Sequence, residues 1–406
     1  MKATVSATLP DAPWRTREGL GRLLDALDAG AGATRYVGGV VRDTLAGIAA
    51  VDIDCATVLA PHDVGARIRA AGFKAVPTGI AHGTVTAILP GGPVEVTTLR
   101  RDLSTDGRRA TVAFTDDWRE DAARRDFTIN ALSADPVSGA IHDYFGGIDD
   151  LAAGRVRFIG DPAQRIAEDH LRILRFFRFH ARFGKGPPDA AGLDACVARA
   201  NDLMALSRER IADELLKLLG LADPVATVAL MVERGILRPV LPEIDAEGAA
   251  RLARLAKREA AFGIAPDGIR RLSALLPRDA ALAARVGARL KLSNAQRARL
   301  ELQAAPVPPA PARAIAWRYP REAADLLLLS DWTDAEIAAA LDMLRTWERP
   351  VFPLKGGDLV ALGLRPGPAV AATLQAIERD WIAAGFADEP WVRERARRAV
   401  AEIVGK

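Results

Sequence analysis

The chain has 406 residues, half of them hydrophobic, so it is long enough for several packed domains rather than one small core. Its 55 Lys and Arg residues against 52 Asp and Glu give a net charge of only +3, so bulk charge alone does not indicate a nucleic-acid ligand. The two cysteines, Cys55 and Cys196, provide no disulfide framework and no zinc-binding spacing, and no apolar run is long enough for a signal peptide or membrane span. We therefore expect a cytoplasmic protein with no membrane association and no obligatory protein partner.

The first 150 or so residues mix short β-like segments with helical ones. We expect a strand running into a turn at 34–41, and further strands within 51–59, 83–90 and 92–100. Residues 62–72 have the pattern of a helix between the second and third of these segments.

The pattern becomes helical from Asp161 onward. An Asp-Pro start and a glycine end predict a helix over 161–184, and Ser207 and Gly220 delimit another. The rest of the chain is helical in pattern, with a proline-rich linker at 305–312. The fold class expected is therefore α+β, with an N-terminal mixed domain followed by a long all-helical remainder.

Asp52 and Asp54 form an acidic pair in the segment "VDIDCAT". Residues i and i+2 of a strand point to one face, so the two carboxylates project together while Val51, Ile53 and Cys55 face a core. Paired hard oxygen ligands favour Mg²⁺, which completes its shell with substrate phosphates. The alternative is a solvated turn that happens to carry two acids.

Gly38 and Gly39 precede the acidic pair and open a predicted helix that carries Arg42. Glycines at such a turn let the backbone approach a ligand, and helix N–H groups with a guanidinium suit a phosphate. The alternative is an ordinary glycine turn with a structural Arg42–Asp43 pair. Together with the acids, this segment predicts a cradle for a triphosphate and a metal ion.

Two arginine clusters follow. Arg124 and Arg125 precede Asp126 in "RRDFTINAL", and "EDHLRILRFFRF" places Asp169, Arg172, Arg175 and Arg178 at steps of three. Residues three apart are neighbours on a helix, so Asp169 and Arg172 are expected to face one ligand. The alternative is that these arginines form salt bridges with neighbouring acids.

The polarity of a carboxylate beside a guanidinium suggests base selection. Cytosine and adenine both present an amino donor beside a ring-nitrogen acceptor, whereas guanine and uracil present the reverse. A carboxylate that accepts and a guanidinium that donates therefore match C and A. A good bidentate contact contributes roughly 1–3 kcal/mol of discrimination. Asp169 and Arg172 are thus predicted to select two nucleotides without a nucleic-acid template.

The segments "GGVVRDTLAG…VDID", "RRDFTINAL" and "EDHLRILRFFRF", in this order, resemble the class II tRNA nucleotidyltransferase and poly(A) polymerase family, closest to its bacterial CCA-adding branch. The resemblance is most specific over 33–180 and becomes weaker toward the C-terminus. It implies a polymerase-beta-type nucleotidyltransferase head, a small mixed sheet with helices, followed by helical neck, body and tail. The implied domains are 1–158, 159–221, 222–305 and 306–406.

The resemblance also implies an activity, which is addition of C, C and A to tRNA 3′ ends from CTP and ATP with release of pyrophosphate. Asp52 and Asp54 would bind Mg²⁺. Nucleotide contacts would come from Gly38, Gly39, Arg42, Arg125, Arg175 and Arg178, and the base would be read by Asp169 and Arg172. Glu95 is either a further acid near the metal or a structural strand residue.

Other activities of the family remain alternatives: A addition, poly(A) synthesis, or an inactive RNA-binding relative. Residues 103–118 resemble the flexible loop that accompanies A addition, which weighs against an enzyme that adds only C. The segment after "RRDFTI" is closer to the CCA-adding branch than to poly(A) polymerases.

Overall fold

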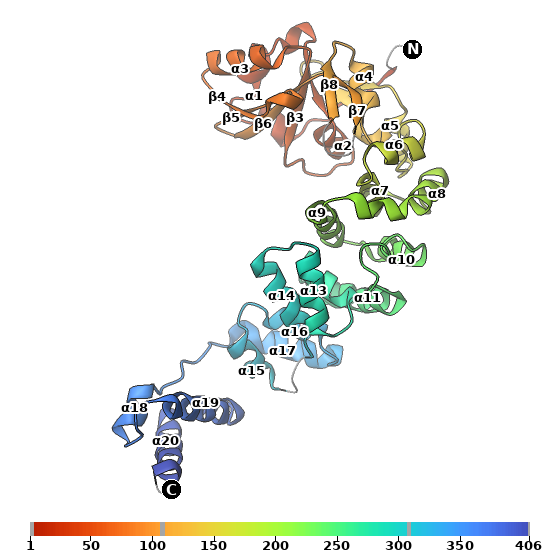
Figure 1. Cartoon of the computed structure of the whole chain (residues 1–406). Helices are drawn as coiled ribbons and strands as arrows, with labels where there is room; N and C mark the ends of the chain where they lie inside the picture. Colours follow the sequence, from red (N-terminus) through yellow and green to blue (C-terminus); the bar gives the residue numbers. More distant parts are fainter. Residues whose placement is uncertain (1–3, 106–109, 307–309, 405–406) are drawn as a thin grey trace. The chain divides into compact units, whose positions relative to one another are not determined.

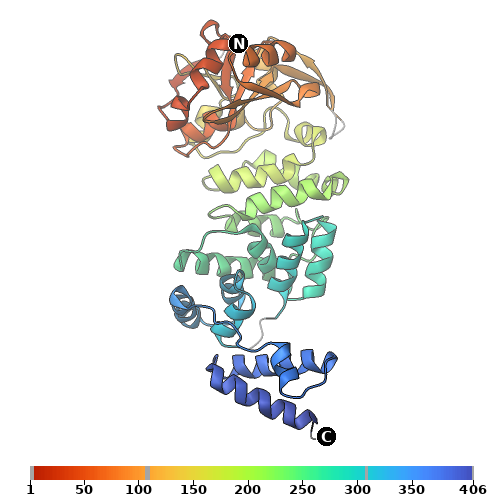
Figure 2. The ribbon, with the colours of Figure 1, turned by 90° about the vertical axis from the view of Figure 1, so that its left-hand side faces the viewer.

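The computed structural model describes residues 4–105, 110–306 and 310–404. The chain forms two compact units, Met1–Ala249 with Arg289–Leu292 and Ala250–Ala288 with Ser293–Lys406. The expected fold class is confirmed, because the first unit holds a mixed sheet with helices and the described part of the second is helical (Figures 1 and 2). The division into four domains remains a prediction.

An eight-stranded sheet organises the head. Its strands follow the order β1-β10-β9-β2-β3-β6-β5-β4, and only β3 and β6 run parallel. The bounds are β1 Thr4–Thr8, β2 Thr34–Val37, β3 Ile53–Thr57, β4 Lys74–Gly79, β5 Thr84–Leu89, β6 Gly92–Thr98, β9 Ser133–Ala134 and β10 Ala140–Asp143. β7 Arg100–Thr105 and β8 Ala110–Phe114 form a separate hairpin.

One face of this sheet carries the main core of the head. Ile53 and Cys55 of β3 are buried there with Val94 and Val96 of β6. The helices α1 (Leu20–Ala26) and α3 (Pro61–Ala70) lie beside the sheet (Figure 1). Their leucine, valine and isoleucine side chains belong to the same core. Because successive strand residues alternate, Asp54 lies on the opposite face of β3. The face of β3 that carries Asp54 therefore lies outside this core and is available for a functional site.

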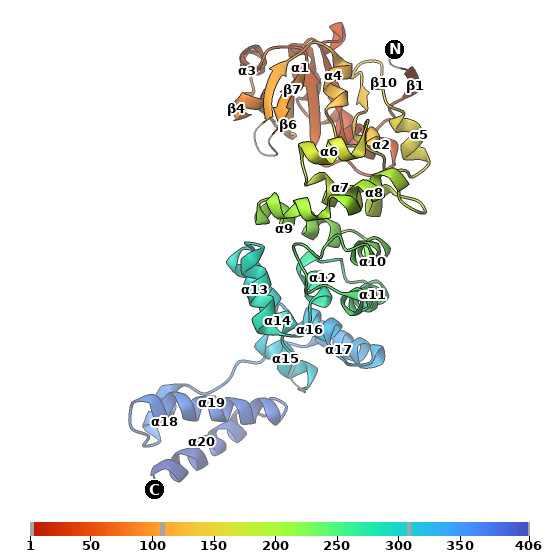
Figure 3. The ribbon, with the colours of Figure 1, turned by 45° about the vertical axis from the view of Figure 1, so that its right-hand side comes forward.

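The remaining helices of the first unit begin with α2 and continue in chain order beyond the sheet. Their bounds are α2 Gly39–Leu45, α4 Trp118–Ala123, α5 Gly147–Ala152, α6 Pro162–Glu168, α7 Arg172–Phe183, α8 Ala190–Ala198, α9 Arg208–Leu219 and α10 Val225–Glu233. The apolar face of α7 is buried, and α7 packs against α9 and α10 (Figure 3). Ser207 and Gly220 flank α9 as predicted.

The single helix predicted over 161–184 is wrong in one respect. α6 ends at Glu168, and Asp169 is extended, with φ −153° and ψ 106°. The Asp169 carboxylate accepts a hydrogen bond from the Leu171 N–H, and its carbonyl accepts one from the Arg172 N–H. Asp169 therefore closes a turn between α6 and α7, a role that aspartate favours because its side chain satisfies nearby backbone N–H groups.

The described helices of the second half are α11 Ala246–Ala261, α12 Gly268–Leu275, α13 Ala280–Arg289, α14 Asn294–Ala304, α15 Ala312–Arg318, α16 Ala323–Leu329, α17 Asp334–Thr346, α18 Gly356–Ala361, α19 Pro368–Ala383 and α20 Glu389–Val404. A buried ionic network joins several of them: Arg270 pairs with Glu259 and Asp325, at 2.6 and 2.7 Å. Residues 307–309 of the predicted linker lie outside the described residues.

No described helix combines the length and apolar content that a membrane span requires.

Candidate functional site

The glycine turn predicted at 38–39 connects β2 to α2. Gly38 has φ 68°, and a Cβ atom there would lie 2.7 Å from Nη1 of Arg125. Only glycine avoids both the backbone strain and this clash. The turn thereby lets the Arg125 guanidinium lie directly against the backbone at the start of α2.

The two aspartates lie at the start of β3, but they differ in environment. Asp54 is half-buried in the strand, whereas Asp52 is exposed and precedes it. The expectation that Val51 faces a core is wrong, since Val51 is 78% exposed and the strand begins only at Ile53. The strand alternation therefore applies to Asp54 but not to Asp52.

Glu95 is the direct neighbour of Asp54 across the parallel β3–β6 pair. Burial, followed by the negative charges of Glu95 and Asp52, raises the pKa of the Asp54 carboxyl to about 6, against the opposing effect of Arg125. Clustered acids without a neutralising cation are costly, so this edge of the sheet is suited to a bound cation.

The donor set at this edge fits a hard divalent ion. Within the described ranges, no group of three His, Cys, Asp or Glu side chains is arranged to hold a metal by itself. An ion held by Asp52 and Asp54 would need additional oxygen ligands. Mg²⁺ is typically coordinated in this way, because it retains waters and substrate phosphates as ligands in addition to one or two carboxylates.

A cavity of about 590 Å³ opens beside the acidic pair. All ten residues predicted for the site line it, and so do four that sequence reasoning did not assign to the site. The lining residues are Gly38, Gly39, Arg42, Asp52, Asp54, Arg124, Arg125, Asp126, Asn130, Asp169, Arg172, Arg175, Arg178 and Phe179. Their individual roles stay predictions, but the three motifs meet in one place.

A series of polar contacts connects α2, which follows the glycine turn, to α7. Arg42 donates to the Asn130 side-chain oxygen, and the Asn130 amide donates to Asp126 at 2.8 Å. Arg175 donates to the other oxygen of Asp126 at 2.7 Å. Burial works against ionisation of Asp126, but Arg175 and these hydrogen bonds hold the pKa of its carboxyl below its usual range. Asp126 therefore stays charged, and it holds both Asn130 and Arg175 in place.

Two further acids hold the arginines of α7 and α2. Glu214, buried on α9, accepts from Arg178 at 2.6 Å. Asp43 accepts from Arg42 and, at 2.9 Å, from Arg182. The salt-bridge reading of the arginine clusters is thus correct in part, because several guanidiniums have carboxylate partners. Sequence reasoning did not find Glu214, although an acid amid the apolar pattern of "IADELLKLL" was an available signal.

The proposed base-reading residues have separate partners. Asp169 accepts from Arg210 of α9 at 2.7 Å, and Arg172 donates to Glu168 at 2.5 Å and to the Arg124 carbonyl at 3.1 Å. Asp169 lies in the break between helices, so the helical i, i+3 argument that brought it together with Arg172 was wrong. The turn between α6 and α7 nevertheless places both Asp169 and Arg172 at the wall of the same cavity.

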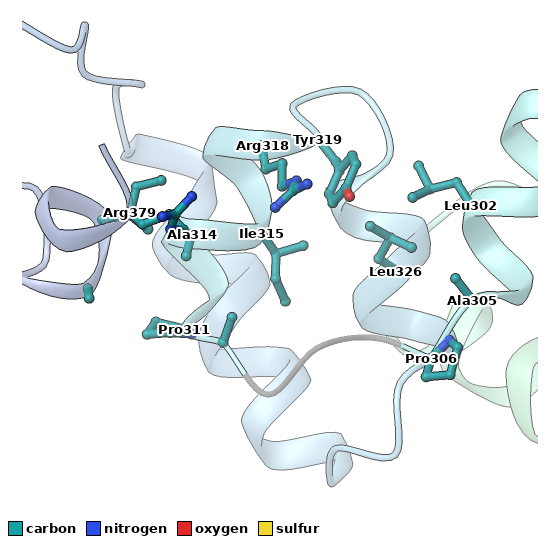
Figure 4. Close-up of a pocket in the computed structure, with 13 residues that line it drawn as sticks. Leu302, Ala305, Pro306, Pro311, Ala314, Ile315, Arg318, Tyr319, Leu326 and Arg379 are labelled. Atoms are coloured by element: carbon teal, nitrogen blue, oxygen red, sulfur yellow. The ribbon is translucent and has the colours of Figure 1, made fainter. Parts of the chain in front are cut away.

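A second cavity, of about 450 Å³, lies in the helical unit between α14, α15, α16 and α19 (Figure 4). Apolar side chains such as Leu302, Ile315 and Leu326 line it, with Arg318 and Arg379 beside them. Its described lining contains no carboxylate, in contrast to the cavity beside Asp52 and Asp54.

The comparisons with known proteins agree with this geometry. Residues 34–157 match the Poly A polymerase head domain, and residues 191–247 match the family described as a probable RNA and SrmB-binding site of polymerase A. A mouse protein, CCA tRNA nucleotidyltransferase 1, mitochondrial, is 34% identical over 369 residues, which cover 87% of this chain and 83% of that one. The CCA-adding enzyme of Lacticaseibacillus paracasei is 32% identical over 394 residues, covering 90% and 92%.

Solved structures show the same similarity. The CCA-adding enzyme of Bacillus stearothermophilus, solved in complex with CTP, aligns with a TM-score of 0.74 and 26% identity over 96% of this chain and 99% of that one. The Thermotoga maritima CCA-adding enzyme, solved with a tRNA, aligns with a TM-score of 0.69 at 20% identity, over 97% of this chain and 100% of that one. At that identity, the second alignment supports the fold.

Proposed function

Because the chain belongs to the family of CCA tRNA nucleotidyltransferases, or CCA-adding enzymes, we propose that it adds C, C and A to the 3′ end of tRNA. The substrates are CTP, ATP and the tRNA acceptor end, and pyrophosphate is released. The observation that carries this proposal is the single cavity in which the acidic pair, the glycine turn and the Asp169–Arg172 pair meet.

Asp52 and Asp54 are the proposed ligands of Mg²⁺. Burial and the nearby acid Glu95 raise the pKa of Asp54, which supports this proposal because a bound cation would stabilise the charged carboxylate. When bound, the ion would supply charge neutralisation for the triphosphate and for the attacking oxygen. Glu95 is exposed and is not part of the cavity lining, so we assign it an electrostatic influence on Asp54 rather than ligation.

The arginines bind and orient the nucleotide. Arg42 and Arg125 flank the glycine turn, where they would hold the triphosphate, and Arg175 and Arg178 extend positive charge along α7. The terminal 3′ hydroxyl of the tRNA then loses its proton to solvent, and its oxygen bonds to the α-phosphorus of the nucleotide. The bond from that phosphorus to the bridging oxygen breaks, and pyrophosphate leaves with the electron pair. Alignment and charge stabilisation account for most of the catalysis in such transfers.

Asp169 and Arg172 select the base. A carboxylate that accepts from an amino group, beside a guanidinium that donates to a ring nitrogen, suits C and A and leaves G and U with unmatched groups. The helical regions after residue 158 are proposed as neck, body and tail that hold the tRNA. We place the protein in the cytoplasm, which agrees with its two free cysteines.

The test is an extension reaction on a tRNA transcript that lacks CCA. Purified protein, Mg²⁺, CTP and ATP should lengthen the RNA and release one pyrophosphate per nucleotide added, and EDTA should stop both. The Asp52→Ala variant serves as the control for contaminating activity. Failure of the wild-type protein to extend the transcript, or equal extension by the variant, would refute the proposal.

A further inference from the structure

Arg165 of α6 lies behind the wall of the nucleotide cavity. Its side chain is 12% exposed, and it is not among the residues that line the cavity. Its Nη2 donates to the carbonyl of Ala123 at 2.8 Å and to the carbonyl of Arg125 at 2.6 Å. One side of the guanidinium is thus hydrogen-bonded to the backbone just after α4. The side chain of Arg125, which extends from this segment, contacts the glycine turn.

The other side of the same guanidinium holds Glu168. Nη1 of Arg165 lies 3.0 Å from one carboxylate oxygen of Glu168 and 2.8 Å from the other. Glu168 also accepts from Nη1 of Arg172 at 2.5 Å, and the backbone carbonyl of Arg165 accepts from that same nitrogen at 2.8 Å. Arg165 therefore supports Arg172 twice, once through Glu168 and once through its own backbone.

These contacts determine which donors of Arg172 remain for a nucleotide. A guanidinium has five N–H groups. Two on Nη1 are directed at Glu168 and the Arg165 carbonyl, and one on Nη2 at the Arg124 carbonyl. One N–H of Nη2 and the N–H of Nε have no hydrogen-bond partner among the described residues. Arg172 is thus held with one defined edge available, and a fixed edge is what base discrimination requires.

We propose that Arg165 is a positioning residue for nucleotide selection, acting on Arg172 through Glu168 while it anchors the chain that carries Arg125. This inference rests on the proposed function, because it concerns which nucleotides that reaction accepts. This positioning role depends on the shape of the Arg165 guanidinium. Its planar fork reaches two carbonyls and a carboxylate at once, whereas a lysine ammonium keeps the charge but offers a single point.

The test compares Arg165→Lys with Glu168→Gln and with the double variant in single-nucleotide extension. Arg289→Lys is the control, because Arg289 also forms a two-bonded pair, with Glu243, but does not line the cavity. Thermal melting establishes that each protein is folded. For every protein, kcat and KM are measured with CTP, ATP, UTP and GTP.

Arg165→Lys should lower the preference for CTP over UTP by about tenfold, since a well-placed bidentate contact provides roughly 1–3 kcal/mol of discrimination. KM for CTP should rise more than kcat falls. The double variant should discriminate no worse than the poorer single variant, because both residues act on Arg172 along one route. Arg289→Lys should match the wild type.

Unchanged selectivity in folded Arg165→Lys, or additive losses in the double variant, would overturn the inference. Such a result with an active wild type leaves the proposed function intact. Absence of any nucleotide addition by the wild type would instead refute the proposed function itself, so the two failures are distinguishable. If Arg165→Lys does not fold, Glu168→Gln decides, since it keeps the side-chain shape and removes the charge that Arg165 holds.

Discussion

Replacing Asp54 by asparagine should stabilise the metal-free protein even as it abolishes nucleotide addition. Burial, and then Glu95, raise the pKa of this carboxyl from 3.8 to about 6, so the folded state carries a charge that it disfavours. The carboxylate of Asp54 forms no hydrogen bond or ion pair with another described residue, and asparagine is close to aspartate in size. The substitution therefore removes the unfavourable charge without breaking a contact.

The expected change in the free energy of unfolding follows from the pKa shift of Asp54. At 1.36 kcal/mol per pKa unit, a rise from 3.8 to about 6 corresponds to about 3 kcal/mol of lost stability when Asp54 is ionised. The folded state binds the proton more tightly than the unfolded chain, so stability falls as pH rises from about 4 to about 6. The gain from asparagine should thus be about 3 kcal/mol at pH 8, roughly half of that at pH 5, and small below pH 4.

Urea unfolding in EDTA, followed by tryptophan fluorescence at pH 5 and pH 8, measures these free energies. Asp52→Asn is the matched control, and its exposed position predicts a smaller gain. Mg²⁺ should stabilise the wild type more than Asp54→Asn, because the ion loses a charged ligand in the variant. A variant that is less stable than the wild type at pH 8, or a gain independent of pH, would refute the reasoning.

Other substitutions test the separate parts of the site. Asp52→Ala should reduce nucleotide addition by several orders of magnitude while filter binding of tRNA stays nearly unchanged; retention of full activity would sink the metal assignment. Arg172→Ala should reduce selection of C and A over U and G by about tenfold in competition assays, given roughly 1–3 kcal/mol for a bidentate contact. Selectivity equal to that of the wild type would show that the base is read elsewhere. Asn130→Ala should raise KM for both CTP and ATP, because Arg42 loses a partner that ties it to Asp126; an unchanged KM would mean that Arg42 is held without it.

Much of the head was predictable because its signals are local. The glycine pair, the alternating strand residues and the Asp-Pro helix start each depend on neighbouring residues, and they predicted β2, β3, β6 and α6. The hydrophobic alternation around Ile53 and Cys55 also located the face of the sheet that is buried. Local rules of this kind need no knowledge of the rest of the fold.

The prediction of one helix over 161–184 was wrong because a side chain interrupts the apolar pattern of the sequence. Apolar spacing continues through 161–184, but Asp169 is extended and its side chain accepts from the Leu171 N–H, so the helix is broken there. Residues 103–118 resemble the flexible loop that accompanies A addition, and this stays a prediction: part of the segment belongs to β7 and β8, and residues 106–109 lie outside the described residues. Partners such as Glu214 and Arg210 are some 40 residues distant from the groups they hold, so only the folded chain reveals them.

We expect this one protein to add C, C and A in order without a template. The most direct measurement uses three tRNA transcripts that end before CCA, after C and after CC, each incubated with CTP, ATP or both and resolved on a sequencing gel. With both substrates, the three transcripts should gain three, two and one nucleotides respectively, each ending at A. Extension of only the CC-ended transcript, or an extended run of A, would contradict it.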